Sequence, residues 1–327
     1  MHPELFKIPF VNFTLHSYGL MLVIGLLLAM QLAKYLARRS GIDGDQFINA
    51  GILALVSGLI GARIVYVLQN FNEFTGGSFG ENLWDAVNLT SGGLVYYGGF
   101  LLATPTLIVW GLAKGVPILR GMDIIAPCLM IGLALGRVGC FLNGCCWGET
   151  CQVGSPVGVT FPYYSGPYLE HVQEGKIRPN PLLYKFDPVT GRQRLVTPKE
   201  AEADPQLRAI VPYERSLRVI NTQLISTATA LLIAAVTTAF FTLYATPGRG
   251  FALMLILEGT TRTLIEGMRV EPKALTIGGH ALTLSMCIGI AIAAAGVAMW
   301  FAVRGLENIR GVGDRAGYPI PPTPATA

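Results

Sequence analysis

Charged residues are scarce in this chain. Asp, Glu, Lys and Arg make up 13% of the 327 residues, whereas hydrophobic types make up 52%, and the mean hydropathy is +0.50. This amount of charge is poorly suited to covering a soluble globule, so the composition favours a membrane protein. The net charge is only +4 and no long basic run is present. We therefore expect no nucleic-acid partner.

Histidine is also rare, and lysine is missing from the last apolar run. The four histidines stand at positions 2, 16, 171 and 280, which gives no metal-binding spacing. The run 281–303 contains no lysine that could form a Schiff base. These two absences argue against a histidine-based metal site and against a retinal-type seven-helix receptor.

Long apolar runs, in contrast, are frequent. A bilayer core needs roughly 20 apolar residues for each spanning helix, and hydropathy indicates about seven such runs. We place them near 17–37, 47–69, 92–113, 123–143, 219–245, 251–268 and 281–303. The first run has no small-residue cleavage site after it, so we interpret it as a retained span and not as a signal peptide. The predicted fold class is an all-α polytopic membrane protein.

The distribution of basic residues predicts the orientation of these spans. Lys and Arg in short loops mark the cytoplasmic side, and the loop 70–91 contains neither residue. Basic residues follow the first, third, fifth and seventh spans, at Lys34, Arg38, Arg39, Lys114, Arg120, Arg249, Arg304, Arg310 and Arg315. We expect the amino terminus outside and the carboxyl terminus inside.

One segment interrupts the hydrophobic rhythm. Residues 149–217 contain GSPVG, YYSGP, RPNP and DPVTGRQ, which indicate strands and turns, and 198–215 could add a short helix. We predict helices one to four in 1–143, a small extracytoplasmic head in 144–217 and helices five to seven in 218–304. The proline-rich tail 305–327 is expected to be cytoplasmic and disordered.

Three predicted spans carry an arginine inside apolar sequence, namely Arg63, Arg137 and Arg262. A charge within the membrane costs at least about 2.5 to 3.5 kcal/mol. In the predicted orientation, all three arginines lie in the outward halves of their helices. A structural ion-pair ladder or snorkelling to the interface could explain any one of them. Three together favour a shared site for a lipid phosphate, which the planar guanidinium binds bidentately.

The sixth span adds further charges at helical spacing. Glu258, Arg262 and Glu266 are four residues apart and Arg269 follows three later, which places them along one helical face. From these residues we infer a phospholipid-headgroup site at the level of the outer leaflet.

Several motifs in this arrangement resemble the bacterial prolipoprotein diacylglyceryl transferases. The family pattern around its headgroup-binding arginine is similar to GRVGCFLNGCCWG, residues 136–148. HSYGLM at 16–21, ARIVYV at 62–67 and GVTFP at 158–162 resemble three further family elements. Arg262, Glu266 and Arg269 match the arginine, glutamate and arginine of its sixth span.

This resemblance implies an enzyme of the bacterial cytoplasmic membrane. It would transfer a diacylglyceryl group from phosphatidylglycerol to the lipobox cysteine of an exported preprolipoprotein, forming a thioether and releasing glycerol phosphate, without a cofactor. The residues carried over as substrate-binding are Arg137, Asn143, Arg63, Tyr18 and Arg269. Those carried over as catalytic are Arg262, Glu266 and Tyr97, although Glu266 could instead only orient Arg262.

The chain departs from the family pattern in its third span. GGLVYYGG places Tyr97 where the family presents a histidine proposed as the base. A tyrosine with a pKa of about 10 is a poor base at neutral pH unless arginines lower that pKa. Tyr97 is therefore expected to donate a hydrogen bond. Glu266, Glu258 and Tyr97 remain candidates for the base, as does a mechanism without one in which arginines acidify the substrate thiol.

The second departure is a group of cysteines with the pattern C-x4-C-C-x4-C, formed by Cys140, Cys145, Cys146 and Cys151. A disulfide from Cys145 or Cys146 to Cys151 is the favoured interpretation, because the outer compartment oxidises thiols. Packed free thiols come next. A metal site or a covalent intermediate ranks last because the spacing is not that of C-x2-C zinc sites, and we assign no metal ligand.

Three other functions remain open. Intramembrane arginines could line the path of a lipid or ion transporter, although their clustering toward one side disfavours it. Cys145 and Cys146 could belong to a thiol redox enzyme. The altered motifs would also fit an inactive or repurposed relative of the transferases.

Overall fold

The computed structural model describes residues 4–8, 13–74, 78–88, 93, 95–187, 191–243, 246–269, 273–277 and 280–304. The predicted tail 305–327 lies outside this part of the chain. The described residues form two compact units. The first draws on 1–25, 129–236 and 253–298, and the second on 26–128, 237–252 and 299–327.

The structure is mostly helical, which confirms the predicted fold class. Five helices are long and apolar enough to cross a membrane: α1 (Ser17–Arg39), α2 (Gly44–Gln69), α5 (Ile118–Asn143), α9 (Thr222–Leu243) and α11 (Leu284–Ala302). At about 1.5 Å per residue, even the 19 residues of α11 extend across most of a bilayer core.

Two further helices correspond to the third and sixth predicted spans. These are α4 (Tyr96–Ala113) and α10 (Arg249–Glu266), of 18 residues each. The described apolar part of α4 is shorter than the five long helices. In α10, Glu258, Arg262 and Glu266 interrupt the apolar sequence. The predicted number of seven spans therefore remains a prediction for these two helices.

The remaining elements are short. They comprise η1 (Phe71–Phe74), α3 (Phe79–Val87), α6 (Gly166–Gln173), η3 (Pro181–Leu183), α7 (Pro198–Ala203), α8 (Pro205–Ile210) and η4 (Val211–Tyr213). Four antiparallel strand pairs join β1 (Glu4–Ile8) to β2 (Phe13–His16), β3 (Gly158–Val159) to β6 (Val219–Ile220), β4 (Tyr184–Asp187) to β5 (Arg192–Leu195), and β7 (Lys273–Ile277) to β8 (His280–Thr283).

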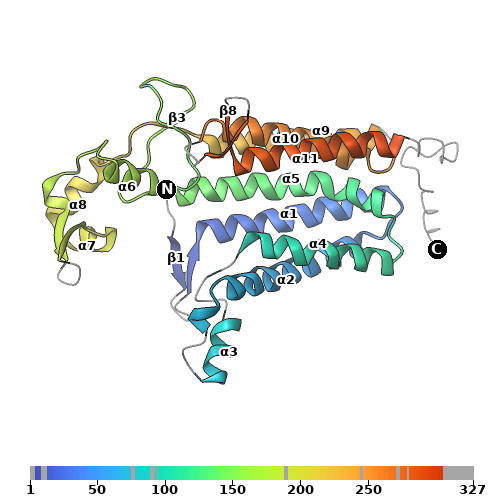
Figure 1. The fold of residues 1–327 in the computed structure, drawn as a ribbon, viewed down its shortest axis with the longest axis horizontal. Coiled ribbons are helices and arrows are strands. Elements are labelled where there is room, and N and C mark those ends of the chain that lie inside the picture. Colours follow the sequence, from blue (N-terminus) through green and yellow to red (C-terminus); the bar gives the residue numbers. More distant parts are fainter. Residues whose placement is uncertain are drawn as a thin grey trace, which may run out of the picture. The chain divides into compact units, whose positions relative to one another are not determined.

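Glycines bring α2 and α4 together in the second unit, where Figure 1 shows them side by side. A Cβ atom on Gly98 would overlap the carbonyl oxygen of Gly61, and a Cβ on Gly61 would overlap that of Gly98. Small residues allow this close backbone contact, which is how helices associate tightly in lipid.

A buried carboxylate fixes the start of α10 in the same unit. Asp123 of α5 accepts hydrogen bonds from the backbone N–H groups of Gly248 at 2.7 Å and Phe251 at 2.9 Å. The Arg120 guanidinium lies 4.0 Å from the Asp123 carboxylate and stacks over the ring of Phe241. Asp123 thus supplies the cap that the first backbone donors of α10 need.

Residues 144–217 contain a small hydrophobic core of their own. Tyr168, Leu183 and Val196 are fully buried in it, together with Tyr163, Ala201 and Leu207. Figure 1 shows α6, α7 and α8 gathered in this region. The short helix expected within 198–215 is confirmed, since α7 and α8 lie there, and each begins with a proline after a capping side chain.

Candidate functional site

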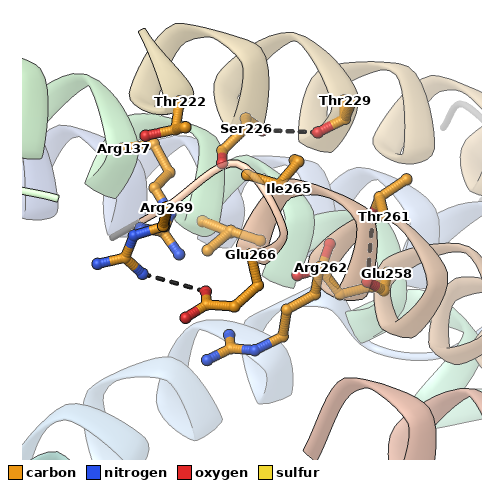
Figure 2. Close-up of a pocket in the computed structure, with 11 residues that line it drawn as sticks. Arg137, Thr222, Ser226, Thr229, Glu258, Thr261, Arg262, Ile265, Glu266 and Arg269 are labelled. Atoms are coloured by element: carbon orange, nitrogen blue, oxygen red, sulfur yellow. Dashed lines mark hydrogen bonds and ion pairs between the residues drawn. The ribbon is translucent and has the colours of Figure 1, made fainter. Parts of the chain in front are cut away.

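A pocket in the first unit is lined by five charged side chains. It is lined from α5, α9, α10 and the turn after α10, by Leu133, Arg137, Thr222, Ser226, Thr229, Glu258, Thr261, Arg262, Ile265, Glu266 and Arg269. Figure 2 shows Arg269, Glu266 and Arg262 reaching into the same region from successive turns, with Arg137 beside them. Two of the three helices that were expected to share a site, those of Arg137 and Arg262, do so.

Helical spacing explains how α10 supplies so many of these groups. Glu258, Arg262 and Glu266 are four residues apart and therefore lie on one face. The helix ends at Glu266, and Arg269 follows in the next turn. The single helical face predicted from the sequence is thus present, and it faces the pocket.

Glu266 and Arg269 form an ion pair at the edge of the pocket. Arg269 Nη1 donates to Glu266 Oε2 at 3.2 Å, and Glu266 is only 4% exposed. A buried carboxylate is costly unless a cation compensates it. The partner of Glu266 is therefore Arg269 and not Arg262, the residue that the sequence suggested it might orient.

Arg269 has an ion-pair partner, whereas Arg137 and Arg262 have none among the described residues. Within the part of the chain that the structure describes, neither guanidinium makes a hydrogen bond or an ion pair, and Arg262 Nε is buried without an acceptor. Buried donors are normally satisfied. Of these two arginines, only Arg262 has such a donor, and Arg269 Nε, although Arg269 is ion-paired, is in the same condition. Arg137 and Arg262 line the pocket without an ion pair among the described residues, so both are available for an anionic ligand.

The polar side chains that α9 contributes were not predicted. Thr222, Ser226 and Thr229 repeat at intervals of four and three residues in a helix that is mainly apolar. That spacing puts them on one face and is a sequence signal that could have been used. Thr229 and Thr222 donate to backbone carbonyls, those of Ser226 and Cys146 respectively.

Four of the eight residues predicted for the site do not line this pocket. Tyr18 packs against Gly139 of α5, where a Cβ would lie 3.0 Å from Tyr18 Cδ2. Asn143 is the last residue of α5 and is exposed. Arg63 and Tyr97 belong to the second unit. Tyr97 is 58% exposed.

Arg63 binds backbone carbonyl groups. Its Nε donates to Ala86 O at 2.8 Å, Nη1 to Gly93 O at 3.0 Å and Nη2 to Asp85 O at 2.6 Å. The guanidinium also stacks near the rings of Tyr66 and Phe74. These bonds satisfy the end of α3, so a structural role explains Arg63 as well as a substrate-binding one does.

The cysteines do not form the expected disulfide. All six are free, Cys151 included. Instead, the Sγ atoms of Cys140, Cys145 and Cys146 lie within 4.8 Å of one another at the end of α5. The sequence pattern did not indicate which of the four clustered cysteines would meet.

The arginines that line the pocket can bind a phosphate group. A model of the prolipoprotein diacylglyceryl transferase family matches residues 3–302. The chain belongs to this family. The long apolar helices fit a membrane protein.

Curated relatives share the family name. A phosphatidylglycerol–prolipoprotein diacylglyceryl transferase of Rhodopirellula baltica is 33% identical over 189 residues, which cover 57% of this chain and 38% of that protein. Enzymes of the same name from Deinococcus radiodurans and Clostridium tetani are 32% and 27% identical, covering 52% and 49% of this chain. The matches span 49% and 61% of those two proteins. The chain thus matches between about two fifths and three fifths of the length of these relatives.

Proposed function

We propose that this protein transfers a diacylglyceryl group from phosphatidylglycerol to the lipobox cysteine of exported preprolipoproteins. The observation that supports this function is the pair of pocket arginines, Arg137 and Arg262, which form no hydrogen bond or ion pair with the residues that the structure describes. A phosphodiester headgroup supplies the missing acceptors, and charge-assisted bonds to arginine are the strong ones.

The reaction uses the same charges. The acceptor thiolate attacks the glyceryl carbon, a carbon–sulfur bond forms, and the carbon–oxygen bond to phosphate breaks. The electron pair moves to the phosphate oxygen, so negative charge grows on the departing glycerol phosphate. Arg137 and Arg262 stabilise that charge in a site that is already organised for it.

The ion pair limits the roles of the two pocket carboxylates. Glu266 is held by Arg269, so we assign it the positioning of that arginine. Glu258 lines the pocket without an ion pair among the described residues, and it is the better candidate to accept the thiol proton. Tyr97 stays a predicted hydrogen-bond donor to substrate, and Tyr18, Asn143 and Arg63 stay predicted substrate contacts.

We further propose the location and orientation predicted from the sequence. The protein would lie in the bacterial cytoplasmic membrane with its amino terminus outside and its carboxyl terminus inside. Residues 144–217 would then form an extracytoplasmic head. The pocket, lined near the end of α5 and the start of α9 that this segment connects, would then face the side where exported proteins emerge.

The test is reconstitution of the purified protein with phosphatidylglycerol and a lipobox peptide, with the thioether product detected by mass spectrometry. Arg137→Ala is expected to reduce kcat/KM by about 100-fold or more, the usual cost of removing a group that stabilises an oxyanion. Arg137→Lys keeps the charge but not the bidentate fork and should lie between Ala and the parent. Arg208→Ala, an exposed arginine of the head, is the control.

Two results would contradict the proposal. Absence of any thioether product from the folded parent protein would indicate a repurposed relative. Activity that survives Arg137→Ala but disappears in Cys145→Ser and Cys146→Ser would indicate thiol redox chemistry instead.

A further inference from the structure

The thiols of Cys140, Cys145 and Cys146 form a compact group that the proposed reaction does not use. Cys140 is buried in the last turn of α5, and the other two are half-buried in the turn that follows. Their three sulfur atoms lie within 4.8 Å of one another. Among the residues that the structure describes, no histidine, carboxylate or further cysteine joins the group.

The backbone holds this group in place from two sides. Gly144, with φ of 71°, reverses the chain after α5, and the Cys145 N–H donates to Cys140 O at 3.0 Å. From α9, Gln223 Nε2 donates to Cys145 O and Thr222 Oγ1 donates to Cys146 O, both at 2.8 Å. These bonds fix the backbone of the two cysteines that follow the helix.

The geometry fits a thiophilic cation. With Zn–S bonds of about 2.3 Å, sulfur ligands of a tetrahedral zinc ion are about 3.8 Å apart, so the thiols need to approach by at most about 1 Å. Three thiolates leave a zinc site with net negative charge. Arg137, one helical turn before Cys140 on α5, supplies a positive charge beside the site.

We propose that Cys140, Cys145 and Cys146 bind one Zn²⁺ ion and leave its fourth position open to the thiol of the acceptor peptide. Zinc is preferred over copper because it is redox-inert and accepts a fourth ligand in a tetrahedral site. A closed structural site has four protein ligands, whereas a site with three keeps one position for water or substrate.

The site lies beside the arginine pocket. Cys140 is three residues after Arg137 on α5 and therefore lies on the same helical face. Thr222 lines the pocket and also bonds the Cys146 carbonyl. A ligand on the zinc ion would consequently sit next to the phosphate held by the arginines.

The role of the open zinc position rests on the proposed function. On binding zinc, the acceptor thiol gives up its proton, for which Glu258 stays the candidate acceptor, and remains as a metal-bound thiolate. Its sulfur then forms the bond to the glyceryl carbon as the carbon–oxygen bond breaks, and the electron pair leaves with glycerol phosphate. No oxidant or reductant is needed. The zinc ion thereby keeps the acceptor thiol deprotonated, in a chain that has Tyr97 in place of the family histidine.

Metal analysis of the full-length protein in detergent tests the first part. After growth with zinc and copper present, we expect about one zinc ion per chain that survives dialysis, as high-affinity thiolate sites retain their ion. Cys140→Ser, Cys145→Ser and Cys146→Ser should each lose it. Cys151→Ser, which alters a cysteine of the same motif outside the group, should retain it.

A measurement on the unaltered protein guards against misfolded variants. Bound zinc should protect the three thiols, but not Cys151, from alkylation, and a chelator should remove that protection. Equal alkylation of all four with and without chelator would overturn the site. A disulfide between any two of the three, or copper in place of zinc, would do the same.

Cobalt substitution tests the open position separately from activity. Cobalt in place of zinc gives thiolate charge-transfer absorption whose intensity rises with the number of bound thiolates. A lipobox peptide should increase it, and the same peptide with serine in place of the cysteine should not. No change with the cysteine peptide would overturn the open position. Zinc binding without thioether formation would instead refute only the proposed transferase function.

Discussion

Replacing Arg262 by methionine separates the function of the pocket from its stability. Arg262 Nε is buried without an acceptor, and an unsatisfied buried donor costs about 1–3 kcal/mol. Methionine keeps most of the side-chain length and removes that cost, although it also removes the attraction of Arg262 to the nearby carboxylates. The loss of the unsatisfied donor raises the free energy of unfolding, and the loss of the attraction lowers it. We expect the free energy of unfolding to stay constant or to rise by up to about 2 kcal/mol.

The same change should nevertheless abolish most of the activity. Loss of one preorganised donor to a developing oxyanion costs about 2.7–4 kcal/mol, which lowers kcat/KM by about 100- to 1000-fold. The assay pairs thioether formation with thermal unfolding followed by tryptophan fluorescence, in the same lipid–detergent mixture. An unchanged or higher unfolding temperature together with this loss of activity is the expected result.

Glu266→Gln is the matched control because it removes a group that does have a partner. Without the Glu266 carboxylate, Arg269 loses its ion pair, so the unfolding temperature should fall. Removing one member of a buried pair costs about 3–5 kcal/mol. If Arg262→Met lowers the unfolding temperature as much as Glu266→Gln does, then Arg262 serves the fold, and the inference of a free anion-binding group is refuted.

Three other predictions concern stability. Asp123→Asn should destabilise the protein by about 2–4 kcal/mol, because the amide replaces the charge that caps α10 through Gly248. Denaturant unfolding measures this loss. A shift in the denaturant midpoint smaller than that of an exposed Asp→Asn change would contradict the prediction. Gly98→Ala should reduce the unfolding temperature markedly, because its Cβ meets the Gly61 carbonyl, whereas alanine at a glycine without close neighbours should not. Burial, reinforced by a nearby lysine, lowers the pKa of His171 in the segment 144–217. Because the unfolded state then binds the proton more readily, this segment should lose stability as the pH falls through about 6.5, which hydrogen exchange with His171→Gln as the reference would measure.

Sequence patterns were most informative where one short-range physical rule dominates. A bilayer requires long apolar helices, so the runs at 17–37, 47–69 and 123–143 became α1, α2 and α5 with ends shifted by a few residues. Helical periodicity likewise placed Glu258 and Arg262 on one face. Both conclusions depend only on residues close together in the chain.

The two arginines Arg63 and Arg137 illustrate the limit of such reasoning. Each stands in a glycine-containing apolar helix, and local sequence does not distinguish them. The difference arises from distant segments: backbone carbonyls of 85, 86 and 93 accept the bonds of Arg63, whereas nothing among the described residues does so for Arg137.

Local patterns were enough to predict a helical membrane protein with arginines inside its apolar runs, because the cost of burying peptide groups and charges in lipid constrains such sequences. Which of these charges find partners within the protein, and which three of the clustered cysteines meet, depends on contacts between distant segments. The thiol group depends on a left-handed turn at Gly144 and on bonds from Thr222 and Gln223. Those contacts join residues about 80 positions apart, and their energies are set by packing that no local pattern records.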